Sequence, residues 1–168
     1  MHYNMIKKNL IFTGFLLLAC NLFGQVRPDD IYDAINQLIE INNVKTISKG
    51  AKPLNINKSS MKEYFYWCLN FGPEKIRISE IDSAFIKNQL SNPKALIWDK
   101  KKLNNKAKIK RKAVDYFTIP LFLNKNMDLF VIYHTSYVGP LDAKGTLELY
   151  KKINSEWKLF SLNLEWIS

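Results

Sequence analysis

The chain has 168 residues, of which 47% are hydrophobic and 13% aromatic, and its formal net charge is +10. This apolar content excludes an intrinsically disordered chain, which lacks enough hydrophobic residues to form a core. The length is enough for about one small domain that buries a real core.

The first 24 residues have the pattern of a secretory signal peptide. Lys7 and Lys8 form a basic flank without acids, and residues 10–19 are apolar apart from Thr13 and Gly14. An apolar run of about 7–15 residues is typical of such signals, and it is shorter than the run of about 20 that a membrane-spanning helix needs. We therefore expect export to the periplasm or the cell exterior, with residues 1–24 as signal peptide and residues 25–168 as a single α+β domain.

Two cleavage positions compete at the end of this leader. The stretch "LLAC" is similar to the lipobox of bacterial lipoproteins, in which Cys20 would be acylated and would anchor the protein to the envelope. The other cut follows Gly24 and leaves Gln25 as the mature N-terminus. We favour this second cut, because Leu18 is bulkier than is usual in a lipobox. With either event only Cys68 remains available, so no internal disulfide is expected.

The elements of the first half are predicted to be helices. Residues 29–42 carry a possible cap at Asp29, and their apolar residues recur at helical spacing. That apolar stripe consists of Ile31, Ala34, Ile35, Leu38 and Ile39. Residues 79–90 predict a second helix, since Ser79 and Asp82 stand at its start and Pro93 follows its end. Residues 60–71 fit either a helix or a strand.

The apolar period changes to two in the second half. The stretches "YFTIPLFLN", "LFVIYHTSYVG", "TLELYKKI" and "WKLFSLNLEWIS" predict four consecutive strands. In the first of them, alternation places on one face Phe117, Ile119, Leu121 and Leu123. Pro120 cannot donate to a strand ladder, so this strand is expected at an edge or with a bulge. The order predicts an α+β fold with N-terminal helices packed on a C-terminal four-stranded antiparallel meander.

Three stretches of the second half, "DYFTIPLFLNKNMDLFVIYHTSYVG", "GTLELYKKINSEWKLF" and "EWIS", carry a family likeness. Over roughly residues 79–168 the chain resembles a group of small exported Bacteroidota proteins without an assigned function. The resemblance implies export and a terminal sheet, and it implies no activity. Members of that group often carry cysteines around the Gly-rich turn, whereas "YVGPLDAKG" has none, so no metal or disulfide follows from the resemblance.

The search for catalytic chemistry finds no enzyme signature. Zinc-ligand, EF-hand and phosphate-loop spacings are absent from the sequence, so no metal or cofactor is expected. His134, the only histidine after the leader, lies on the strand face of Phe130 and Ile132. We expect it to be a structural residue that makes a satisfied hydrogen bond. Cys68 lies in the apolar stretch "YFYWCLNF", where a buried thiol is expected rather than a reactive one.

A dense run of basic residues follows Asp99. It holds eight of the chain's 25 basic residues, namely Lys100, Lys101, Lys102, Lys106, Lys108, Lys110, Arg111 and Lys112. One interpretation is a solvated connector or exposed edge; the other is a contact surface for an acidic protein, lipopolysaccharide or lipid headgroups. Nucleic acid is not expected as the partner, because no stacking aromatics are interleaved with the lysines. A membrane partner is expected only with lipidation at Cys20.

Two functions from different classes remain open. The first is an exported cell-envelope binding protein without catalytic activity, for which an immunity-type protein that blocks a secreted toxin is one example. The second is a small hydrolase or isomerase with a cone similar to the nuclear-transport-factor-like fold. Its candidate catalytic residues are His134, Tyr133, Tyr137 and Asp115. A pocket with His134 and a carboxylate facing inward would favour the enzyme, and a filled core with a basic outer face would favour binding.

Overall fold

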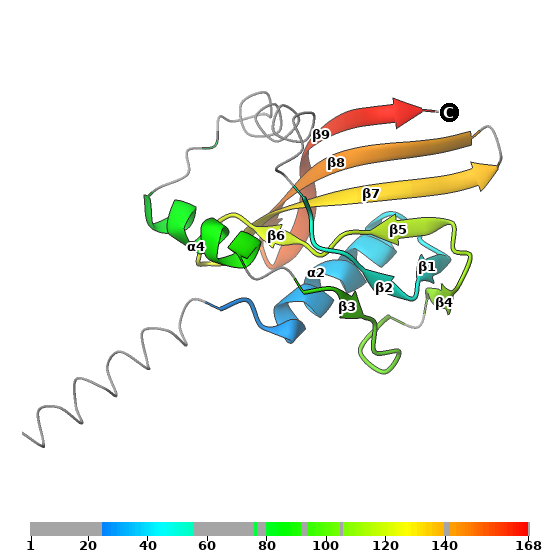
Figure 1. Ribbon diagram of the computed structural model, residues 1–168, viewed down its shortest axis with the longest axis horizontal. Coiled ribbons are helices and arrows are strands. Elements are labelled where there is room, and N and C mark those ends of the chain that lie inside the picture. The colour runs from blue at the N-terminus through cyan, green and yellow to red at the C-terminus, as the bar shows by residue number, and fades with distance from the viewer. Residues whose placement is uncertain are drawn as a thin grey trace, which may run out of the picture.

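The computed structural model describes residues 25–55, 76, 80–91, 94–104, 106–139 and 142–167. These residues form two helices, a mixed seven-stranded sheet and a separate two-stranded sheet (Figure 1). The predicted leader with Cys20, the segment 60–71 and Cys68 lie outside the described residues.

Helix α2 spans Pro28–Ile41, and its apolar stripe is buried as predicted. Its first turn differs from the expectation, because Arg27 rather than Asp29 occupies the N-cap position. The backbone N–H of Arg27 donates to the Asp30 carboxylate at 3.0 Å, and the Arg27 guanidinium pairs with the same carboxylate at 2.9 Å. Negative charge at the start of a helix is favourable because it faces the positive end of the helix dipole.

The large sheet joins strands from both halves of the chain. Its order is β4 (Lys108–Lys110), β1 (Thr46–Ser48), β5 (Asp115–Phe117), β7 (Leu129–Gly139), β8 (Asp142–Ile153) and β9 (Glu156–Ile167), with β6 (Leu121–Phe122) paired to β7. Strand β1 runs parallel to β4 and to β5, and the other pairs are antiparallel. The small sheet pairs β2 (Gly50–Ala51) with β3 (Leu96–Ile97).

The prediction of N-terminal helices on a four-stranded antiparallel meander was therefore wrong. Strand β1 lies in the first half of the chain, yet it pairs with β4 and β5 in the second half, which makes the sheet mixed. Strands β1, β4 and β5 have three residues each, which is too short for a periodic signal. Their pairing depends on contacts between distant parts of the sequence.

The expected single strand around Pro120 is divided in two. Strand β5 ends at Phe117, and β6 begins at Leu121. Phe117 packs in the core on the α2 side, whereas Leu121 and Leu123 pack in the core on the other side. The predicted shared face was wrong, because the interruption at Pro120 carries the chain from one face of the sheet to the other.

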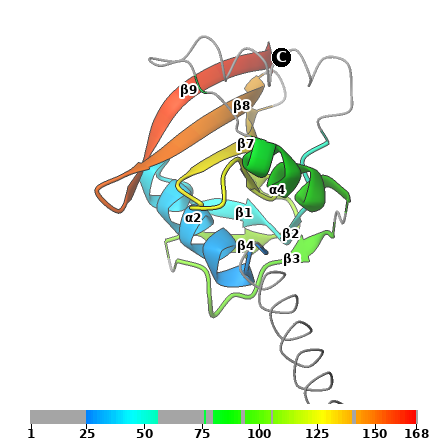
Figure 2. The ribbon, with the colours of Figure 1, turned by 90° about the vertical axis from the view of Figure 1, so that its left-hand side faces the viewer.

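Hydrophobic cores cover both faces of the sheet. Helix α2 packs on one face against Phe130, Tyr150 and Trp157. Helix α4 (Glu80–Ser91) packs toward the other, where Ile86 joins the leucines of β8. Figure 2 shows the two helices on opposite sides of β7. The sheet is thus the middle layer, and its alternating side chains are divided between two apolar environments.

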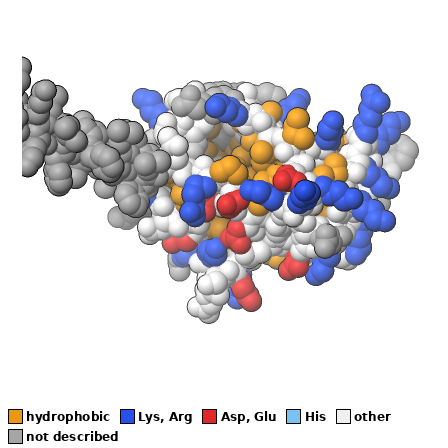
Figure 3. All heavy atoms as spheres, turned by 90° about the horizontal axis from the view of Figure 1, so that it is seen from below, with side chains coloured by type: hydrophobic (Ala, Val, Ile, Leu, Met, Phe, Trp, Pro, Cys, Tyr) orange, Lys and Arg blue, Asp and Glu red, His pale blue; other side chains and the backbone are white. Residues whose placement is uncertain are grey.

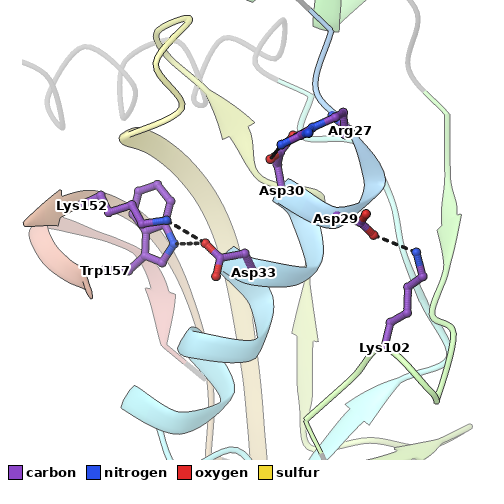
Figure 4. A network of polar contacts seen from close by, with 7 residues as sticks. All are labelled: Arg27, Asp29, Asp30, Asp33, Lys102, Lys152 and Trp157. Carbon is purple, nitrogen blue, oxygen red and sulfur yellow. Dashed lines mark hydrogen bonds and ion pairs between the residues drawn. The ribbon is translucent and has the colours of Figure 1, made fainter. Parts of the chain in front are cut away.

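Polar contacts join α2 to the β8–β9 hairpin (Figure 4). Asp33 accepts hydrogen bonds from Lys152 Nζ at 2.9 Å and from the indole Nε1 of Trp157 at 3.3 Å. The backbone N–H of Trp157 donates to Gln37 Oε1 at 2.9 Å. On the other flank of the helix, Lys102 Nζ donates to Asp29 at 2.8 Å.

The buried stripe of α2 should dominate its contribution to stability. Leu38 has no exposed surface, so Leu38→Ala is expected to lower the free energy of unfolding by about 2–5 kcal/mol, through lost burial and the cavity left behind. Ile41 lies on the same helix and is 49% exposed, so Ile41→Ala should change stability by less than about 1 kcal/mol. Urea denaturation followed by circular dichroism measures both. Equal losses for the two variants would contradict the observed packing of the helix.

Candidate functional site

The only described histidine lies in a buried row of charged groups that crosses three neighbouring strands. His134 on β7 is 7% exposed, and its Nε2 lies 3.0 Å from Asp115 Oδ1 on β5. Its Nδ1 lies 3.2 Å from Glu148 Oε1 on β8. The imidazole also stacks on Phe117, with ring centroids 4.3 Å apart. Strand register brings His134 close to both carboxylates, since Phe117 and Thr146, each two residues from an acid, are the partners of His134 in the two adjacent strands.

Further hydrogen bonds extend this row to helix α2. The hydroxyls of Thr146 and Tyr150 donate to the two oxygens of Glu148 at 2.7 and 2.8 Å. Asn42, which caps the C-terminal end of α2, donates to the Tyr150 hydroxyl oxygen at 3.4 Å. The network therefore links the centre of the sheet to the helix that covers it.

The two carboxylates determine the protonation state of His134. An ionised carboxylate only accepts hydrogen bonds, so both ring nitrogens must donate, and this requires the imidazolium form. Burial lowers the pKa of His134, but the hydrogen bonds and negative charges of Asp115 and Glu148 outweigh it and raise the pKa to about 9. Burial likewise raises the pKa of Glu148, and the bonds and charge of His134 outweigh it and lower that pKa.

This geometry makes His134 a structural cation. A general base needs a free lone pair within reach of a substrate proton, and both nitrogens of His134 are occupied by carboxylates. Of the residues that sequence reasoning grouped around it, only Asp115 is brought into contact. Tyr133 and Tyr137 lie one and three residues from His134 along β7, so their side chains lie on the face of the sheet opposite to that of His134.

A surface hollow lies away from this network, at the start of α2. Its volume is about 310 Å³. It is lined by Arg27, Asp30, Asp33, Phe122, Lys125, Asn126, Met127, Lys152 and Trp157. Four of its charged groups are paired, Arg27 with Asp30 and Lys152 with Asp33, each at 2.9 Å. The first pair lies within the start of α2 and the second joins α2 to the β8–β9 hairpin, as Figure 4 shows, so the hollow presents little unpaired charge to a ligand.

The basic run predicted from the sequence is divided by the structure into two parts. Lys102 pairs with Asp29 at 2.8 Å and Lys106 pairs with Glu40 at 3.3 Å, so both fasten the loop to α2. Hydrogen bonds of Asn104 with Asn36 and Glu40 strengthen the same contact. These two lysines therefore contact α2, and their charges are paired with acids of that helix.

The remaining basic residues are exposed. Lys100 and Lys101 lie in a turn, and the others form a group that we call the basic edge, consisting of Lys108, Lys110, Arg111 and Lys112. Strand β4 contains the first two and is an edge strand of the large sheet. Within the described part of the chain, no ion pair involves the basic edge. Figure 3 shows Lys and Arg side chains gathered at the end of the molecule where Figure 1 places β4.

Sequence reasoning missed Glu148, Tyr116 and Val114. Glu148 falls between Leu147 and Leu149, where alternation indicates only that it faces away from those leucines. The pairing of Ile132 with Glu148 places this carboxylate on the face of His134, and that pairing is not visible in the sequence. The signal available was the position of an acid in the middle of an apolar strand, which often marks a buried pair.

Comparison with known protein families, with curated proteins and with solved structures finds no match to this chain. In the described residues, neither helix is long and apolar enough to cross a membrane. The same residues contain no group of three or more acidic, histidine or cysteine side chains placed to hold a metal ion.

Removal of the buried imidazolium should strongly lower the free energy of unfolding. His134→Gln leaves Asp115 and Glu148 buried without their cation, so a loss of about 3–5 kcal/mol in the free energy of unfolding is expected. Lys152→Gln removes a partly exposed cation from Asp33 and should cost less than about 1 kcal/mol. Chemical denaturation at pH 6.5 compares the two variants. A His134→Gln variant as stable as the wild type would contradict the charged network.

The network also predicts a pH dependence of stability. The folded-state pKa of His134, about 9, lies above the ordinary value of 6.5, so the stabilisation is complete below about pH 6.5 and is lost as pH rises through about 9. Glu148 has a lowered pKa, so its contribution is lost instead as pH falls below its ordinary value. Unfolding free energies between pH 6 and 10 should fall for the wild type. His134→Gln should be flatter over that range, and an equally steep fall in this variant would assign the effect to other groups.

Proposed function

We propose that this protein is an exported, non-catalytic binding protein that recognises an anionic partner through the basic edge. The observation that carries the proposal is the division of the basic run. Two of its lysines are paired to α2, whereas the four residues of the basic edge are exposed without an ion pair to a described residue. A protein that neutralises an exported toxin is one protein of this class.

Stability does not account for the basic edge. Four neighbouring cations repel one another, and even exposed cations that form ion pairs contribute only about 0–1 kcal/mol each. Positive charge on an edge strand does discourage pairing with other chains. Attraction of a negatively charged partner is a second effect of the same charges, since a concentrated field speeds the encounter. The occupied imidazole of His134 supports the absence of catalysis, because the enzyme alternative counted His134 among its candidate catalytic residues and both ring nitrogens face carboxylates.

The proposal predicts weaker binding to polyanions when the basic edge is neutralised. The variant carries Lys108→Gln, Lys110→Gln, Arg111→Gln and Lys112→Gln, and the control carries Lys87→Gln, Lys94→Gln, Lys125→Gln and Lys158→Gln, which are exposed elsewhere. Poly-L-glutamate and phosphatidylglycerol vesicles serve as anionic probes. Loss of four exposed charge contacts should weaken affinity for at least one probe by about 10-fold, mainly through slower association.

Salt separates the electrostatic part of this binding. The Debye length falls from about 10 Å at 0.1 M to about 3 Å at 1 M, so wild-type affinity should fall steeply over that range. The control, which has the same net charge as the variant, should stay within about 3-fold of the wild type. Equal affinity of all three proteins at low salt would show that the basic edge serves solubility or edge protection and would overturn the proposal.

A further inference from the structure

The sheet face opposite α2 brings aromatic and basic residues together at the β4 end. Lys108 on β4 pairs with Thr46 on β1, and the Thr46 hydroxyl accepts a hydrogen bond from the backbone N–H of Val114 at 2.9 Å. The backbone oxygen of Val114 in turn accepts from the N–H of Tyr137 on β7 at 2.8 Å. These contacts make one row across the sheet, which begins with a lysine and ends with a tyrosine.

A second row lies beside the first. Lys110 pairs with Ser48 on β1, and the parallel register of Ile47 with Asp115 places Ser48 next to Tyr116 on β5. Tyr116 and Tyr137 then meet edge to face, with ring centroids 5.7 Å apart and an interplanar angle of 85°. Alternation along each strand puts these side chains on the same face, away from α2.

The centre of this face is apolar and open. Val114 is 41% exposed and Tyr137 is 45% exposed, and they are among the few large hydrophobic residues left uncovered in the described chain. Helix α4 lies over the opposite end of the sheet from β4, so it does not cover this region (Figure 1). The basic edge, by contrast, lies at the border of the same face, on β4 and directly after it.

We propose that Val114, Tyr116 and Tyr137 form the centre of a protein-binding face whose rim is the basic edge, and that its partner is an acidic polypeptide with aromatic or apolar side chains among its acids. This inference rests on the proposed function and specifies the class of partner. An apolar, tyrosine-containing centre with charges at the rim is the usual anatomy of a protein interface. Tyrosine and arginine are also enriched among the residues that dominate binding energy.

The ring geometry favours a protein over a single-stranded nucleic acid. Successive bases stack on exposed aromatic faces. Here the two rings are nearly perpendicular, so one ring edge is directed at the face of the other and no continuous platform results. The sequence shows no aromatics interleaved with the lysines, yet pairing of four strands places two tyrosines on the same sheet face as Lys108 and Lys110. This face therefore provides a compact hydrophobic contact that is bordered by cations on its β4 side.

The test compares two soluble probes of equal length on the full chain: poly-L-glutamate and a copolymer of glutamate and tyrosine. Wild type should bind the copolymer at least about 10-fold more tightly, because a well-packed aromatic contact contributes at hot-spot level. Tyr137→Thr and Val114→Thr should each reduce this preference to less than about 3-fold while leaving poly-L-glutamate binding unchanged. Val114→Thr preserves shape and strand propensity, so it serves as the variant that keeps the fold. Ile97→Thr, at a residue 70% exposed on β3, is the matched control and should retain the preference.

The outcomes separate the two proposals. Equal binding of both polymers by the wild type, or an unchanged preference in Tyr137→Thr and Val114→Thr, would overturn the aromatic centre while leaving the basic edge as an anion site. Copolymer binding that depends on Tyr137, without binding to either poly-L-glutamate or phosphatidylglycerol vesicles, would support the aromatic centre and overturn the proposed electrostatic function. Tighter binding of an oligothymidylate or of phosphatidylglycerol vesicles than of the copolymer would overturn the choice of a polypeptide partner, and no binding to any probe would overturn both proposals.

Discussion

The ion triad of Asp115, His134 and Glu148 links three neighbouring strands of the large sheet, of which β5 is separated in the sequence from the β7–β8 hairpin. Each member lies on a different strand of the large sheet, and each is buried. Charges in such a place are tolerated only when they neutralise one another and fill their hydrogen-bonding capacity. The imidazolium meets that condition because it donates to both carboxylates, and the hydroxyls of Thr146 and Tyr150 supply further donors to Glu148. The register of β5, β7 and β8 is therefore coupled to the charge state of one histidine.

Side chains alternate between the two faces along each strand, so the alternation that buries these charges also decides which residues lie on the other face. On β7, Phe130, Ile132 and His134 face α2, whereas Tyr133 and Tyr137 face the other side. Residues that are neighbours in the sequence of β7 consequently lie on opposite faces of the sheet. The buried face contributes stability, and the open end of the other face is left for contact with a partner.

The charged residues outside the core are likewise divided by their neighbours. Lysines near α2 find acids on that helix, as Lys102 does with Asp29 and Lys106 with Glu40. In the basic edge, Lys108 and Lys110 lie on the edge strand β4, Arg111 and Lys112 directly follow it, and none of the four pairs with a described acid. Their positive charge is therefore directed at solvent, and this makes attraction of an anion physically reasonable at that end of the molecule.

The sequence specifies the local elements of this protein, because they depend on short-range periodicity. It located the buried stripe of α2, the second helix near residues 80–91 and the strand face that His134 shares with Phe130 and Ile132. It also located the basic run and the interruption at Pro120. The pairing and register of the strands depend on tertiary contacts. Strand β1 is three residues long and pairs in parallel with β4 and β5, so neither its existence nor its partners leave a periodic pattern. That pairing places Lys110 and Tyr116 on either side of Ser48, and the register of β8 sets Glu148 beside His134, since contacts between strands depend on how the whole chain packs.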